Sequence, residues 1–296
     1  AGFMRRLVRM MCTTSLDPVK VVSSWAQTLW QELDYSKEAE MMEQMRGSLC
    51  SRVGGLVIPE VCWQLSSVRV LATEWVTGVS VSKDPSQLQA DHIRIGVETY
   101  VAMIVDLGLV HADPHAGNMI VTPGGGLCLL DFGMVISIPP AHRMAWASCL
   151  VNLVRQNHEA TLDSLVEIGF FPRECPRDKI MPVMSKIWTE LVSCGSSTRM
   201  RKEAVRHCYQ EIRTLACTFE FSLPDYYLAL VRALLTLEGL ALTADCDFDI
   251  FQVAFPTALR ILTVNAAREV QAKASSAFQA STQQLQEILR RDWRRV

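Results

Sequence analysis

A short hairpin between two polar loops constrains the fold of this chain more than any other stretch of its sequence. Two apolar runs, 119–121 and 127–130, enclose the turn sequence Pro-Gly-Gly-Gly, which is typical of a β-hairpin. The polar loop 111–118 precedes the first run, and the tripeptide Asp-Phe-Gly at 131–133 follows the second. Because the strands of a hairpin fold back on each other, we expect the two polar segments to meet at one end of a small sheet.

Oxygen-bearing side chains in these loops indicate phosphoryl-transfer chemistry. Asp113 and Asn118 lie in the first loop, and Asp131 opens the second. Hard oxygen ligands suit Mg²⁺, which takes the rest of its coordination shell from water and phosphate. Phosphoryl transfer needs metal ions on the phosphates and one carboxylate near the attacking oxygen. We therefore interpret Asn118 and Asp131 as metal ligands and Asp113 as the base or orienting group. A capped loop with chance spacing is the structural alternative.

Helical periodicity dominates the rest of the chain. Asp17-Pro18 predicts a helix start, and the pattern after it runs as one helix or a pair of helices to about residue 47. Short β-rich runs at 56–63 and 68–74 are joined by a polar turn. Further helices are expected over 91–107, 139–156, 158–169, 178–194, 200–218, 224–243 and 257–292. The sequence thus predicts an α+β fold that is mostly helical.

Composition excludes several classes of protein. The chain is 49% hydrophobic with a formal net charge of −2, which excludes a disordered segment and gives no global attraction to nucleic acid. None of its ten cysteines forms a CxxC pair, so the sequence carries no zinc or redox half-site of that kind. Buried free thiols in a reducing compartment are expected instead. No apolar run reaches the length of a transmembrane span.

Several motifs resemble one family of proteins. The loop HADPHAGN at 111–118, followed by Asp-Phe-Gly, resembles the protein-kinase-like superfamily and, within it, the UbiB family of atypical kinases, also called aarF-domain-containing kinases. The stretch ELDYSKEA at 32–39 is similar to that family's ExD signature followed by its helix C glutamate. Residues 71–78 look like its hinge, and residues 223–256 look like its late helical segment. The resemblance covers nearly the whole chain.

This resemblance implies a fold and a set of contacts. It implies a kinase-like fold with a partial small lobe over 1–78 and a helical large lobe over 79–296. Glu38 would pair with an ATP-binding lysine, and main-chain groups of 74–76 would meet adenine. His115 would lie near phosphate, in the place of a loop lysine. The nucleotide-contacting residues implied in this way are Glu32, Asp34, Glu38, Glu74, Val76 and His115.

The chain also departs from the family pattern. The family's small lobe carries a KxGQ motif, an alanine-rich loop and the ATP-binding lysine ahead of the ExD helix, and none of these precedes Glu32. Lys20 superficially resembles that lysine, but it follows a helix start and is interpreted as a surface lysine. We therefore expect the isolated chain to bind ATP weakly or not at all. Ala112 and Ala116 replace a common Arg and Pro, which removes no reacting group.

The segment after the Asp-Phe-Gly tripeptide bears on the substrate. Only residues 134–138 separate it from the proline pair at 139–140, so the long activation segment that lets protein kinases bind a peptide is not in this sequence. This favours a small-molecule or lipid substrate, or ATP hydrolysis that drives another process.

The resemblance therefore implies a UbiB-type kinase or ATPase that depends on Mg²⁺ and ATP. Such a protein would support quinone or isoprenoid-lipid metabolism at a membrane surface in a mitochondrion or plastid, with lipid or quinone-pathway proteins as partners. One alternative is a small-molecule phosphotransferase of the aminoglycoside or choline kinase type, which the ExD helix disfavours. The other is a catalytically inactive pseudokinase scaffold, which would not need Asp113, Asn118 and Asp131.

Overall fold

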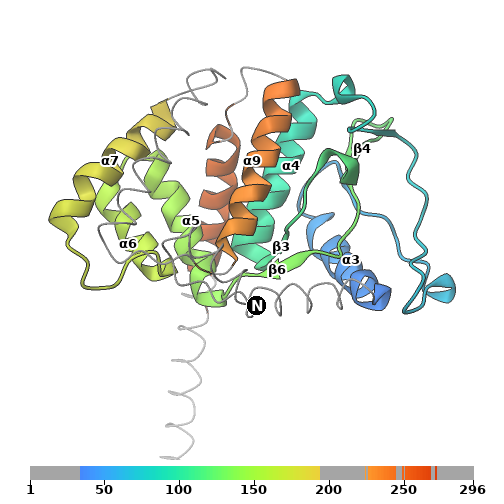
Figure 1. Ribbon diagram of the computed structural model, residues 1–296, viewed down its shortest axis with the longest axis horizontal. Helices are drawn as coiled ribbons and strands as arrows, with labels where there is room; N and C mark the ends of the chain where they lie inside the picture. Colours follow the sequence, from blue (N-terminus) through green and yellow to red (C-terminus); the bar gives the residue numbers. More distant parts are fainter. Residues whose placement is uncertain are drawn as a thin grey trace, which may run out of the picture. The chain divides into compact units, whose positions relative to one another are not determined.

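The computed structural model describes residues 34–193, 224, 226–244, 249, 251–267 and 271 (Figure 1). These residues fall into two compact units, and each unit draws on separate stretches of the chain. The first unit holds the described residues of 34–103, 109–138 and 226–244, and the second holds those of 104–108, 139–193 and 251–267. The expected division into lobes after residue 78 stays a prediction.

A four-stranded sheet in the first unit contains the predicted hairpin. Its strand order is β1-β5-β4-β2. β4 (Met119–Val121) and β5 (Leu127–Leu129) pair antiparallel, and the turn between them places Gly125 at φ +75°, which costs a glycine little. β1 (Leu56–Val57) joins β5 in parallel, and β2 (Val79–Ser80) runs antiparallel to β4. The hairpin prediction is confirmed.

A second sheet of two strands is not indicated by the sequence pattern. β3 (Leu109–His111) pairs antiparallel with β6 (Val135–Ser137), and His111 lies opposite Val135. The chain passes from β3 to β4 through residues 112–118, and from β5 to β6 through residues 130–134. Both polar segments therefore run from one small sheet to the other, and the two ladders hold them side by side.

The helices of the first unit begin and end at recognisable signals. α3 (Tyr35–Leu49) begins after Asp34, whose carboxylate accepts the Ser36 N–H at 3.2 Å. α4 (Ala90–Ala102) ends five residues before its predicted end, in a π turn over Met103–Leu107. α9 (Tyr227–Ala244) packs against α4 in Figure 1. Short 3-10 turns cover Trp63–Leu65, Pro85–Gln87 and Ala116–Asn118.

The β-rich run predicted at 68–74 is not a strand in the structure. Isolated bridges replace a ladder in this part of the chain, one of them between Val61 and Thr73. The side chains of Val68 and Val70 are 56% and 52% exposed. Valine favours strands because it packs on a half-buried pleated surface, and no neighbouring strand among the described residues provides one here.

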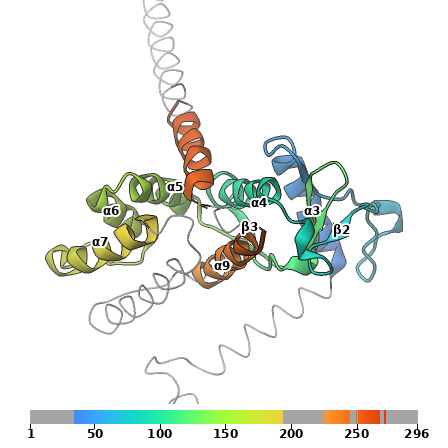
Figure 2. The ribbon, with the colours of Figure 1, turned by 90° about the horizontal axis from the view of Figure 1, so that it is seen from above.

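The second unit is helical. α5 (Pro140–Val154), α6 (His158–Ile168) and α7 (Arg177–Ser193) lie side by side in Figure 2, close to their predicted ranges. Residues 251–267 form a further helix. The predicted helix over 200–218 and the part of the predicted helical stretch up to residue 33 lie outside the described residues, as does the part of the last predicted helix beyond 271. Within the described ranges, no helix combines the length and the hydropathy that a transmembrane span would need.

Candidate functional site

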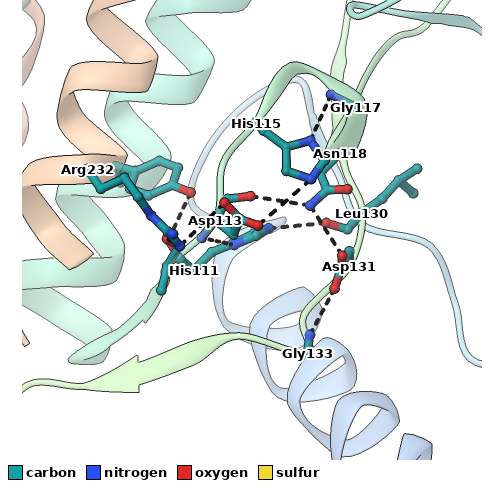
Figure 3. Close-up of polar contacts among 11 residues, drawn as sticks. His111, Asp113, His115, Gly117, Asn118, Leu130, Asp131, Gly133 and Arg232 are labelled. Atoms are coloured by element: carbon teal, nitrogen blue, oxygen red, sulfur yellow. Dashed lines mark hydrogen bonds and ion pairs between the residues drawn. The ribbon is translucent and has the colours of Figure 1, made fainter. Parts of the chain in front are cut away.

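The loop between β3 and β4 holds three of the predicted site residues in a stretch braced by its own backbone. The His115 N–H donates to the Asp113 carbonyl at 2.8 Å, and the Asn118 N–H donates to the His115 carbonyl at 2.9 Å. The Asn118 side-chain amide also donates to the Asp113 carbonyl at 3.3 Å. Figure 3 shows the three side chains gathered on one side of this loop. The loop's own hydrogen bonds therefore fix its shape.

The turn between β5 and β6 brings Asp131 to Asn118, as expected from the hairpin. The Leu130 N–H donates to the Asn118 carbonyl at 2.8 Å, and the Asn118 side-chain amide donates to Asp131 Oδ2 at 3.4 Å. Asp131 has φ +61°, a conformation that is costly for a residue with a Cβ. Its Oδ1 accepts the Gly133 N–H at 3.2 Å, which helps to hold the turn.

His111 joins the two loops through both ring nitrogens. It is 1% exposed, and its Nδ1 accepts the Asp113 N–H at 3.1 Å. The ring proton must therefore lie on Nε2, which donates to the Leu130 carbonyl at 3.2 Å. Burial lowers the pKa of His111, so the neutral form is favoured, and its ring packs 5.4 Å from that of Phe132. His111 therefore packs the first loop against the Asp131 turn.

Two residues from helices hold consecutive carbonyl groups of the first loop. The Tyr100 hydroxyl on α4 donates to the His111 carbonyl at 3.1 Å. Burial, and then the charge of Asp113, raise the pKa of Tyr100, so this hydroxyl stays protonated. Arg232 on α9 donates to the Ala112 carbonyl at 2.7 Å and lies 3.4 Å from Asp113 Oδ1. No sequence signal marks Tyr100, because it looks like an ordinary core residue of an apolar helix face.

Glu38 on α3 reaches the second loop. Its Oε1 accepts the Phe132 N–H at 3.2 Å. A Cβ at Gly133 would lie 3.3 Å from Asp131 Oδ1 and 3.5 Å from Glu38 Oε2, so both carboxylates border this glycine. Burial raises the pKa of Glu38, and the charge of Asp131 raises it further, against the opposing effect of the Phe132 N–H. The carboxyl groups of Glu38 and Asp131 thus lie close together at the Asp-Phe-Gly turn.

A cavity of about 260 Å³ opens on the α3 side of this turn. Its lining consists of Asp34, Lys37, Glu38, Met41, Phe132, Gly133 and Val135. The Ser36 hydroxyl lowers the pKa of Asp34, which caps the helix. The structure therefore places Asp34 and Glu38 of the predicted nucleotide-contacting set beside the turn that carries Asp131.

The remaining predicted residues are not part of this cluster. Glu74 comes directly after the isolated bridge between Val61 and Thr73, and its N–H donates to the Glu60 carbonyl at 2.8 Å. Burial raises the pKa of Cys128 on β5 to about 12, and the charges of Cys50 and Glu74 add to this, so Glu74 lies near the sheet. Within the described part of the chain, no hydrogen bond or ion pair joins Val76 to the cluster. Glu32 and Lys20 lie outside the described residues.

Replacing Glu38 by glutamine is expected to stabilise the chain at neutral pH. The amide removes the repulsion with Asp131 and keeps an oxygen for the Phe132 N–H, which should raise the thermal unfolding midpoint by about 1–3 °C at pH 7. Because folding raises the pKa of Glu38, this carboxyl stabilises the folded chain fully below pH 4.5, its usual pKa. That contribution is lost as the pH rises through the raised pKa. The gain should therefore vanish at pH 4.

Differential scanning fluorimetry of the wild type and Glu38→Gln at both pH values measures this effect. Glu40→Gln, on the exposed side of the same helix, is the matched control and should leave the midpoint unchanged. A gain of the same size at pH 4, or none at pH 7, would contradict the assignment of strain to the ionised Glu38.

The chain matches a family model described as ABC1 atypical kinase-like domain over residues 2–165. The protein named ACTIVITY OF BC1 COMPLEX KINASE 3, chloroplastic, of Arabidopsis thaliana is 28% identical over 253 residues, which span 83% of this chain and 35% of that protein. An uncharacterised aarF domain-containing protein kinase, chloroplastic, of the same organism is 27% identical over 244 residues, with 82% and 34% covered. The chain thus spans about a third of the length of these curated relatives.

A solved structure, the erythromycin complex of Rv3197 from Mycobacterium tuberculosis, is similar to this chain with a TM-score of 0.52. The alignment has 17% sequence identity and covers 85% of this chain and 62% of that one. At this identity the likeness concerns the fold alone. Together with the family model, it confirms the mostly helical α+β, kinase-like fold expected from the sequence.

Proposed function

Because this chain belongs to the UbiB family of ABC1 atypical kinase-like proteins, we propose that it forms the catalytic region of a kinase or ATPase that uses ATP and Mg²⁺. One observation carries this proposal: Asp113, Asn118 and Asp131, from two separate loops, lie within one hydrogen-bonded cluster. Phosphoryl transfer depends mainly on positioning and on charge stabilisation, so a preformed acidic cluster of this kind is suited to it.

The donor set fits a magnesium ion. Asp131 offers a carboxylate and Asn118 an amide oxygen, and hard oxygen donors of this kind suit Mg²⁺. Among the described residues, no cluster of three or more His, Cys, Asp and Glu side chains is arranged to hold a metal by itself. A Mg²⁺ ion held by Asn118 and Asp131 would complete its shell with water and nucleotide phosphates, and would neutralise charge on the transferred group.

The protein's own residues take the remaining roles. Asp113 orients the attacking hydroxyl or water and accepts its proton, and His115, 53% exposed and 3.9 Å from Asp113 Oδ2, faces the phosphates. Glu38 pairs with a cationic group of the small lobe, which would relieve its crowding with Asp131. Asp34 and Glu32 border the nucleotide site, and the main chain at 74–76 meets the adenine base.

The substrate and location follow from the segment after the Asp-Phe-Gly turn and from the relatives. Residues 135–137 form β6 directly after this turn, and α5 begins at Pro140, which leaves no room for a long peptide-binding segment between them. We infer a small-molecule or lipid acceptor, or ATP hydrolysis coupled to quinone or isoprenoid-lipid metabolism. Several relatives carry the word chloroplastic in their names, which supports a plastid location.

Nucleotide binding by the full-length protein tests the proposal. We expect Mg²⁺ to increase the affinity for ATP about tenfold or more, as measured by calorimetry with and without a chelator. Asp131→Asn removes a charged ligand and should abolish this dependence on Mg²⁺. Full-length protein is required because the ATP-binding lysine is expected outside the described residues.

The control is Asp91→Asn, an exposed carboxylate on α4 that pairs with Arg94 and lies away from the cluster. It should bind ATP with the same dependence on Mg²⁺ as the wild type. Equal binding by the wild type and Asp131→Asn would refute the metal assignment. Binding that depends on Mg²⁺ without any turnover of ATP would favour the pseudokinase alternative.

A further inference from the structure

We propose that Arg232 is a positioning residue for Asp113, supplied to the catalytic loop by a helix that lies 120 residues further along the chain. The inference rests on the proposed function, because it assigns the means by which the Asp113 carboxylate is oriented for phosphoryl transfer. Arg232 lies within the family-like segment 223–256, and the sequence pattern gives it no role.

The first support is the geometry of the two contacts. One guanidinium nitrogen of Arg232, Nη2, donates to the Ala112 carbonyl at 2.7 Å and lies 3.4 Å from Asp113 Oδ1. These acceptors belong to consecutive residues. A single cation therefore restrains both the peptide group that precedes Asp113 and the rotation of its carboxylate, while Oδ2 remains on the side of His115.

The second support is that the loop itself supplies no lysine or arginine, and its exposed His115 lies 3.9 Å from the other carboxylate oxygen of Asp113, Oδ2. Residues 111–118 contain no lysine or arginine, and His111 is buried with a lowered pKa. Figure 3 shows Arg232 reaching Asp113 from the side opposite Asn118 and Asp131. It therefore lies away from the proposed metal ligands, where it can restrain Asp113 without competing for Mg²⁺.

The third support is the framework that carries the arginine. Tyr100 on α4 donates to the His111 carbonyl, and Arg232 on α9 donates to the Ala112 carbonyl. The two helices pack against each other, so together they hold two consecutive carbonyl groups of the loop. The side chain of Arg232 is 52% exposed. An ion pair this exposed adds little to folding stability, so its principal effect is on orientation.

Arg232→Met in the full-length protein separates orientation from stability. Loss of the restraint should lower kcat for ATP turnover about 10-fold to 100-fold, with the KM for Mg-ATP within about twofold of the wild type. The thermal midpoint should move by less than about 3 °C. Arg232→Lys keeps a cation but loses the planar fork, and should recover part of the lost kcat.

Amide hydrogen exchange supplies a measurement that does not need activity. Exchange across 112–118 should become several-fold faster in Arg232→Met, and exchange in β4 and β5 should not change. Arg94→Met is the matched control, because the pairs that Arg94 forms with Asp91 and Glu98 among the described residues lie at the surface. It should alter neither kcat nor exchange in the loop.

The outcomes distinguish this inference from the proposed function. A wild-type protein without ATP turnover would overturn the proposed function, and the exchange measurement would still decide the role of Arg232. Unchanged exchange at 112–118 would overturn the positioning role. An unchanged kcat with a raised KM for Mg-ATP would also overturn it, since Arg232 would then contribute to substrate binding instead.

Discussion

Asp113→Asn is expected to lower the rate of ATP turnover by the full-length protein by about 10²- to 10⁴-fold while leaving nucleotide binding almost intact. The substitution keeps the size of the side chain and removes its ability to accept a proton. It also removes the negative charge that lies 3.4 Å from the Arg232 guanidinium. The proposed metal ligands, Asn118 and Asp131, are untouched, so the dependence of ATP affinity on Mg²⁺ should persist.

Steady-state kinetics and calorimetry together measure this separation of binding from turnover. Asp91→Asn is the matched control and should have wild-type values for both. If Asp113→Asn turned over ATP at the wild-type rate, Asp113 would not be the orienting base. If it instead lost Mg²⁺-dependent binding, Asp113 would belong with the metal ligands.

The meeting of the two polar loops could be predicted from the sequence because the relevant signals are local. The turn sequence at 123–126 and the apolar runs beside it define the hairpin, and a hairpin of known length brings Asp131 back to Asn118. The residue types then indicate the chemistry. Spacing and turn chemistry were sufficient here because no long-range contact had to be known.

The rest of the site depends on contacts that a single sequence does not reveal. β3 and β6 have only three residues each, and their pairing becomes visible only when the loops between them are folded. Tyr100 and Arg232 reach the loop from different helices, and nothing in the local pattern of either helix distinguishes them. At 68–74 the sequence predicts too much: β-branched residues indicate a strand, but in the structure this segment forms only isolated bridges among the described residues.

His111→Ala is expected to lower the free energy of unfolding of the first unit by about 3 kcal/mol. The imidazole is 1% exposed, and its loss would leave the partly buried Asp113 N–H and Leu130 carbonyl without their partner. The packing with Phe132 would be lost as well. His115→Ala is the control, because its 53% exposed side chain should cost much less. Urea denaturation, followed by amide exchange at 112–118 and 130–134, measures the difference.

The pH dependence of stability tests whether the His111 imidazole is neutral in the folded chain. The pKa of His111 is below its usual value of 6.5 in the folded chain, so at acid pH the unfolded chain binds a proton that the folded chain does not. Stability contributed by His111 is therefore complete above about pH 6.5 and falls as pH decreases through that value towards the lowered pKa. His111→Gln keeps a donor and an acceptor without titrating, and its stability should fall less between pH 7.5 and pH 5.5.

The difference between the wild type and His111→Gln is the informative quantity, because burial also lowers the pKa of His92 and gives a fall of the same sign in both proteins. That common contribution cancels in the comparison. Parallel curves for the two proteins would mean that folding does not lower the pKa of His111. The folded chain would then not favour the neutral ring that accepts the Asp113 N–H and donates to the Leu130 carbonyl, and the bridge between the two loops would be refuted.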